Sequence, residues 1–147
     1  MKIKNCIITK SDTEIIKNWK VTVNDIHSGI DLSATDVYSP FYGVVIDCVY
    51  SPQDRYSVII QYNAYTCVRL CNIVSLAVKR GSLVTEGQLV GKCNKFVHVE
   101  FLSYYKPDGL PPMSVRIENL SYYKVNPTEL VLGKLNFPVI FDKRYER

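Results

Sequence analysis

Two short stretches decide how this chain is interpreted: HSGIDLSA at residues 27–34 and FVHVE at residues 96–100. They contain the only two histidines among the 147 residues. His27 and Asp31 stand four residues apart around a glycine, so both can turn toward one metal ion, and His98 can add a ligand from a neighbouring strand. Three protein ligands with an open fourth position are typical of a catalytic zinc site. The pattern alone is not specific, since two histidines and an aspartate occur in most chains.

Short apolar runs separated by turn residues fill the middle of the chain. The β-branched and aromatic runs lie at residues 43–50, 56–62, 66–70 and 95–102. Many short strands at close spacing predict an all-β fold, a sandwich or a barrel-like pair of sheets. A weak helical candidate covers Asp12 to Trp19, with Ser11 or Asp12 as its cap.

The C-terminal third differs in composition. Residues 103–125 are rich in Tyr and Pro, and we expect a long excursion with one strand at residues 113–118. Its paired tyrosines, Tyr104 and Tyr105, could stack on bases or sugars, but amphipathic cover at an interface is the more common role. Residues 126–130 predict a turn or a helical start. Residues 137–147 predict a final strand or a docking arm, so we divide the chain into a domain at 1–132 and an arm at 133–147.

Charge and hydropathy exclude several classes of protein. The formal net charge is +4 and the basic residues are scattered, which argues against nucleic-acid binding. No segment approaches the ~20 apolar residues that span a bilayer. The first residues lack the apolar stretch of a signal peptide, so we expect synthesis and folding in a cytoplasm. The five cysteines are an odd number, which favours reduced, mostly buried thiols over a disulfide framework.

Four stretches together resemble the lysostaphin-type zinc endopeptidases, which cut cross-links in bacterial peptidoglycan. They are HSGIDLSA (27–34), VYSP with GVV (37–45), VKRG with VTEGQLVG (78–91), and FVHVE (96–100), where the family has His-x-His-Phe-Glu. Their order and spacing agree over about residues 20–102. The resemblance implies the family's antiparallel β fold with a C-terminal extension here, and zinc held by His27, Asp31 and His98.

The chain departs from the family where the chemistry is done. Phe96 stands at the first histidine of His-x-His, and an ungapped alignment puts Asn72 at the family's other catalytic histidine. A one-residue slip would place Cys71 there instead. The family's long loop before His-x-His is reduced here to residues 92–95, so we expect a shallow substrate groove or none. Losing an oxyanion donor typically costs about 100- to 1,000-fold in rate.

These departures lead to three hypotheses. The first is a non-catalytic member that serves as a structural or attachment component of a bacteriophage tail or baseplate. It would be located in the virion and would contact other tail proteins or copies of itself. The second is an active zinc endopeptidase that cleaves peptidoglycan cross-bridges with rearranged groups. The third is a module that binds peptidoglycan without cutting it. Zinc binding and purely hydrogen-bonded histidines both stay open.

Overall fold

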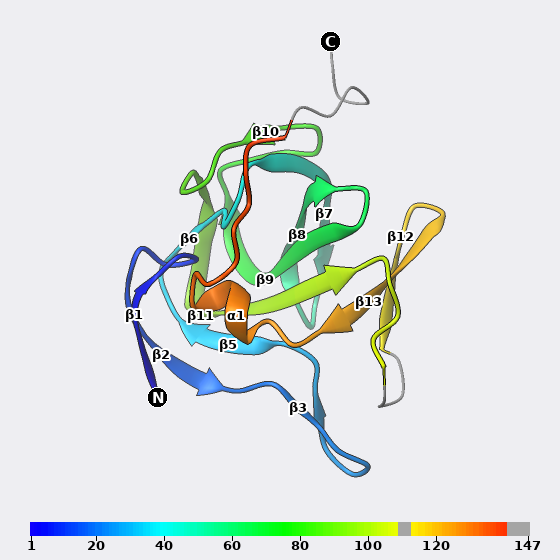
Figure 1. Ribbon diagram of the computed structural model, residues 1–147. Coiled ribbons are helices and arrows are strands. Elements are labelled where there is room, and N and C mark those ends of the chain that lie inside the picture. Colours follow the sequence, from blue (N-terminus) through cyan, green and yellow to red (C-terminus); the bar gives the residue numbers. More distant parts are fainter. Residues whose placement is uncertain (109–112, 141–147) are drawn as a thin grey trace.

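The computed structural model describes residues 1–108 and 113–140. Within them the regular secondary structure is almost entirely β-strand, arranged as Figure 1 shows. The elements are β1 (Lys2–Cys6), β2 (Ser11–Lys17), β3 (Lys20–Val21), β4 (Ile26–His27), β5 (Ile30–Ser33), β6 (Asp36–Tyr38), β7 (Gly43–Ser51), β8 (Arg55–Asn63), β9 (Thr66–Leu76), β10 (Leu83–Val84), β11 (Leu89–Ser103), β12 (Ser114–Ile117), β13 (Leu120–Val125) and α1 (Thr128–Val131).

One antiparallel sheet contains most of these strands. Its order within the described residues is β1-β2-β5-β11-β9-β8-β7-β10, and β6 and β13 also pair with the long strand β11. The sheet curls on itself, while the hairpins β3–β4 and β12–β13 project from the body (Figure 1). The predicted all-β antiparallel fold with a barrel-like sheet is confirmed.

Strand alternation places the core on one face of β11 and polar groups on the other. Val97 and Val99 are fully buried among the apolar side chains of the core. Since successive side chains point to opposite faces, His98 and Glu100 share the other face. In β5, Ile30 and Leu32 are buried in the core in the same way. The two strands therefore bring their polar faces side by side.

The expected helix over Asp12–Trp19 is wrong, because residues 11–17 form the strand β2. Thr13 points into the interior and Ile15 pairs with Leu32, so sheet pairing outweighs the weak helical pattern. Asp12 caps no helix: its Oδ1 accepts a hydrogen bond from the Asn5 amide across the β1–β2 hairpin.

The C-terminal region also differs in part from expectation. The Tyr/Pro-rich excursion contains two strands, since β13 joins β12 in a hairpin and pairs with β11. The predicted turn or helical start at 126–130 is confirmed by α1. Residues 137–140 form no strand, but Phe137 packs against Phe41 and Tyr62. The rest of the predicted arm, residues 141–147, lies outside the described residues, as do 109–112 of the excursion.

The described part of the chain has no helix with the length and apolar character needed to cross a membrane.

Candidate metal centre

The structure brings the three predicted ligands together. His27 ends β4, Asp31 lies on β5, and His98 is the register partner of Asp31 on β11. Asp31 Oδ1 lies 3.3 Å from His27 Nε2 and 2.6 Å from His98 Nδ1. One ligand atom from each residue falls within 4.8 Å of the other two. All three side chains are largely buried, at 12%, 15% and 19% exposed for His27, Asp31 and His98.

Gly29 makes this convergence sterically feasible. A Cβ on Gly29 would stand 2.6 Å from His98 Cε1 and 2.6 Å from the Val99 carbonyl oxygen. The loop between His27 and Asp31 therefore passes directly over the His98 ring, at a distance that only glycine allows. The glycine of the HSGID stretch is thus required by contact with a distant strand.

Each histidine has a hydrogen-bond partner that fixes its tautomer. His27 Nδ1 lies 2.9 Å from the Asn18 carbonyl oxygen, which can only accept, so His27 Nδ1 carries hydrogen. His98 Nε2 lies 3.0 Å from Glu100 Oε2 and donates to it. Metal-ligating histidines usually donate their second ring N–H to a carbonyl or a carboxylate in this way. His27 Nε2 and His98 Nδ1 are the ring nitrogens left for a metal ion, and both lie next to Asp31 Oδ1.

This arrangement fits a divalent cation. Two acceptor atoms, His98 Nδ1 and Asp31 Oδ1, repel each other at 2.6 Å unless a proton or a metal ion lies between them. Burial alone would lower the pKa of His98, but the hydrogen bonds that it donates to Asp31 and Glu100, and the charges of these carboxylates, raise it to about 9. In the metal-free state His98 is therefore protonated and donates to Asp31. Two imidazoles and a carboxylate are also the ligand types of a tetrahedral zinc site.

A largely buried ion-pair cluster contacts the candidate ligand His98. Glu100 is 2% exposed and accepts from Arg69 Nη1, Lys124 Nζ and His98 Nε2, each at 3.0 Å. Burial would raise the pKa of Glu100, but the His98 hydrogen bond and the charges of Arg69 and Lys124 lower it to about 2. Sequence reasoning missed this cluster. The signal available was the position of Glu100, two residues after His98 on one strand and hence on the same face.

Phe96 and Asn72, the residues that the resemblance aligns with the family's catalytic histidines, border a pocket of about 190 Å³ beside the candidate ligands. Its lining residues are Asp31, Gln53, Asp54, Cys71, Asn72, Phe96 and His98. The Asn72 side-chain amide donates to the carbonyls of Asn94 and Phe96, at 3.2 and 2.8 Å. Asn72 has a φ of 70° and lies at an irregularity in the β9–β11 pairing. Its two side-chain hydrogen bonds therefore connect the strands where the backbone ladder is interrupted.

Cys71, the alternative at this position, is the register partner of His98 and is buried. Burial raises the pKa of its thiol to about 12, and the Ser57 hydroxyl donates to its sulfur at 3.5 Å. Cys71 therefore stays a neutral thiol near neutral pH. Asp54 is paired with Arg69 at 3.2 Å. The site can hold a metal ion, but the lining residues offer no histidine beyond the ligand His98.

Comparison with known proteins agrees with this geometry. The sequence profile of peptidase family M23 matches residues 25–103, which carry all three candidate ligands. No curated protein sequence matches the chain significantly.

Three solved structures show the same fold at low sequence identity. Lysostaphin aligns with a TM-score of 0.63 at 12% identity, over 81% of this chain and 50% of its own. The catalytic domain of the prophage-encoded M23 protein EnpA from Enterococcus faecalis aligns with a TM-score of 0.60 at 20% identity, over 79% and 89%. A chain of the SpoIIQ–SpoIIIAH pore-forming complex aligns with a TM-score of 0.62 at 17% identity, over 89% and 92%. This chain thus spans about half the length of lysostaphin. Because the family profile covers more than half of its residues, the chain belongs to peptidase family M23.

Proposed function

We propose that this chain is a non-catalytic M23 domain that binds zinc through His27, Asp31 and His98 and acts as a structural or attachment component of a phage tail or baseplate. One observation carries the loss of catalysis. The three ligands and their hydrogen-bond partners are intact, whereas Phe96 and Asn72 occupy the positions where the resemblance places the catalytic histidines.

A zinc ion bound here would polarise a peptide carbonyl and lower the pKa of a bound water to about 7. Hydrolysis also needs groups that move protons and stabilise the oxyanion. The Phe96 ring can do neither, and the Asn72 amide already donates to two backbone carbonyls. General acid–base help is worth about 100- to 10,000-fold and one oxyanion donor about 100- to 1,000-fold. Their combined loss removes roughly four to seven orders of magnitude in rate.

The intact ligand set favours one alternative, an active zinc endopeptidase that cleaves peptidoglycan cross-bridges with rearranged groups. A substitution that restores a histidine separates the two. In a non-catalytic domain, zinc-loaded Phe96→His gains hydrolysis that the wild-type protein lacks. If the wild-type protein already cleaves peptidoglycan, Phe96→His adds little and His98→Ala abolishes the activity.

A role in an assembly is supported by two further observations. EnpA, which shares the fold, is prophage-encoded, and another structure with this fold is a chain of a two-protein pore complex. In addition, Tyr65, Tyr104 and Tyr105 form an exposed aromatic cluster, with Tyr65 and Tyr105 stacked at 5.3 Å. We expect other tail proteins, or a second copy of the chain, as partners. Binding to peptidoglycan without cleavage is the remaining alternative.

Two experiments test the proposal. Elemental analysis should give one zinc per chain in the wild-type protein and none in His27→Ala. An antibody raised against the purified domain should label the tails of virions from the strain that encodes it. Virions without label would rule out the tail role, and sedimentation of the protein with purified cell wall would instead favour the peptidoglycan-binding module.

A further inference from the structure

We infer that Glu100 is the positioning residue of the metal centre, and that the buried cluster of Arg69, Glu100 and Lys124 holds His98 in its metal-binding tautomer. The inference rests on the proposed zinc site. It adds that the site includes a residue from β13, which lies beyond the residues that match the family profile.

The contacts of Glu100 leave it one orientation. Its Oε1 accepts from Arg69, and its Oε2 accepts from both His98 and Lys124. Arg69 is the register partner of Glu100 on β9 and is itself anchored by Asp54 and Ser57, at 3.2 and 3.3 Å. The Glu100 carboxylate cannot rotate away from His98 without breaking its ion pairs with Arg69 and Lys124 in a largely buried cluster, which is costly.

The orientation of Glu100 sets the role of His98. The carboxylate at Nε2 keeps hydrogen on that nitrogen, so Nδ1, which lies next to Asp31, is the nitrogen left for a metal ion. Within the part of the chain that the structure describes, Glu100 is the hydrogen-bond partner of Nε2, so removing its carboxylate removes the preference for this tautomer. Outer partners of this kind typically contribute 10- to 100-fold to metal affinity.

Lys124 ties the β12–β13 hairpin to the same centre. Its Nζ reaches Glu100 Oε2 at 3.0 Å and Ser28 Oγ at 3.2 Å. Ser28 belongs to the loop that carries His27 and Gly29. One lysine thus joins the ligand loop, the partner of His98 and the hairpin, so the Tyr/Pro-rich excursion supplies a structural part of the metal centre.

The test uses the fact that the full chain has only two histidines. Long-range ¹H–¹⁵N NMR of the imidazoles, with one equivalent of Zn²⁺, resolves which nitrogen of each ring binds metal. In the wild-type protein the ¹⁵N signals should show the two rings bound through different nitrogens, His27 through Nε2 and His98 through Nδ1. In Glu100→Gln the zinc affinity, measured by chelator competition, should fall about 10- to 100-fold. The His98 signals should then show a mixture of the two tautomers, while the signals of His27 stay unchanged.

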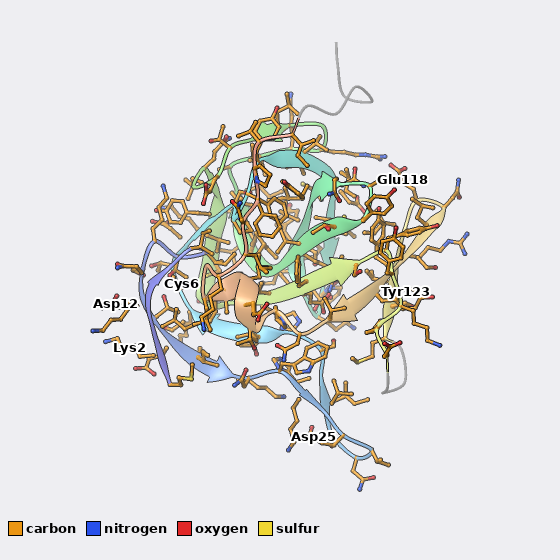
Figure 2. All side chains as sticks on the ribbon, viewed as in Figure 1. Lys2, Cys6, Asp12, Asp25, Glu118 and Tyr123 are labelled. Carbon is orange, nitrogen blue, oxygen red and sulfur yellow. The ribbon has the colours of Figure 1, made fainter. Side chains whose placement is uncertain are left out.

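The matched control is Glu118→Gln, which removes the carboxylate of an exposed pair with Arg80. Glu118 lies at the tip of the β12–β13 hairpin, and the substitution should leave zinc affinity unchanged (Figure 2). Because Glu100→Gln leaves Arg69 facing a neutral amide, Arg69→Met with Glu100→Leu serves as a second variant. It removes the buried pair while keeping apolar volume, which often preserves folding, and it should show the same loss of affinity.

The outcomes separate this inference from the proposed function. If adding Zn²⁺ does not change the imidazole ¹⁵N signals of the wild-type protein, the zinc site is refuted, and the role of Glu100 with it. Wild-type zinc affinity and an unchanged His98 pattern in both Glu100 variants refute the role of Glu100 alone.

Discussion

Gly29→Ala should damage stability and metal binding together. The added Cβ would meet His98 Cε1 at 2.6 Å, His98 Nε2 at 2.8 Å and the Val99 carbonyl oxygen at 2.6 Å. Ordinary contact begins near 3.4 Å, so the neighbours must move by several tenths of an ångström. Val99 cannot move easily because it pairs with Ile30 in the β5–β11 ladder. His98 cannot move without leaving Asp31 and Glu100.

Overpacking of this kind costs about 1–3 kcal/mol, which corresponds to roughly a 5- to 150-fold change in the folding equilibrium. Urea unfolding followed by Trp19 fluorescence measures the loss of stability, and chelator competition measures the zinc affinity. Gly133→Ala is the control, because no atom of the described residues lies within 4 Å of its added Cβ and its φ of 69° adds only backbone strain. It should cost about 1–2 kcal/mol and leave zinc affinity unchanged. A Gly29→Ala protein with wild-type stability and zinc affinity would refute this reasoning.

Three further predictions concern other parts of the molecule. Phe137→Ala should destabilise the fold by about 1–3 kcal/mol, because its partly buried ring packs on Phe41 and Tyr62. Thermal unfolding measures this loss. Val139→Ala is the control and should leave the midpoint unchanged, because Val139 is 81% exposed. In the metal-free protein the pKa of His98 is raised from 6.5 to about 9. The protonated side chain therefore contributes about 3 kcal/mol to the free energy of unfolding below pH 6.5, and this contribution is lost as the pH rises to 9. The urea midpoint should fall across this window, and equal midpoints at pH 6 and pH 9 would contradict the ion pair. Cys71, whose thiol pKa is raised by burial to about 12, should resist iodoacetamide at pH 8 in the folded state and react after unfolding, as mass spectrometry would show.

The fold and the ligand set could be predicted because local patterns carry them. The apolar runs at 43–50 and 56–62 form β7 and β8 with nearly the expected bounds, since runs of β-branched residues favour strands. The candidates His27, Asp31 and His98 converge because the motifs that contain them end one strand and occupy two paired ones. Whether they bind zinc stays a prediction.

The supporting groups could not be predicted, because they depend on pairing between distant strands. Lys124 bonds to Ser28, which lies 96 positions away in the sequence. Lys124 belongs to β13, a strand of polar and aromatic residues that shows no clear strand pattern in the sequence. The Asn18 carbonyl that orients His27 is a backbone atom and leaves no trace in the sequence. The misread helix at 12–19 has the same origin, because β2 is stabilised by its neighbours β1 and β5.

The central claim is that the chain keeps the metal ligands of an M23 peptidase but has lost the groups that move protons. Release of new amino groups from purified peptidoglycan by the zinc-loaded wild-type protein tests it most directly. The account predicts no release above that of the buffer. Release that disappears in His98→Ala would contradict it and establish an active endopeptidase.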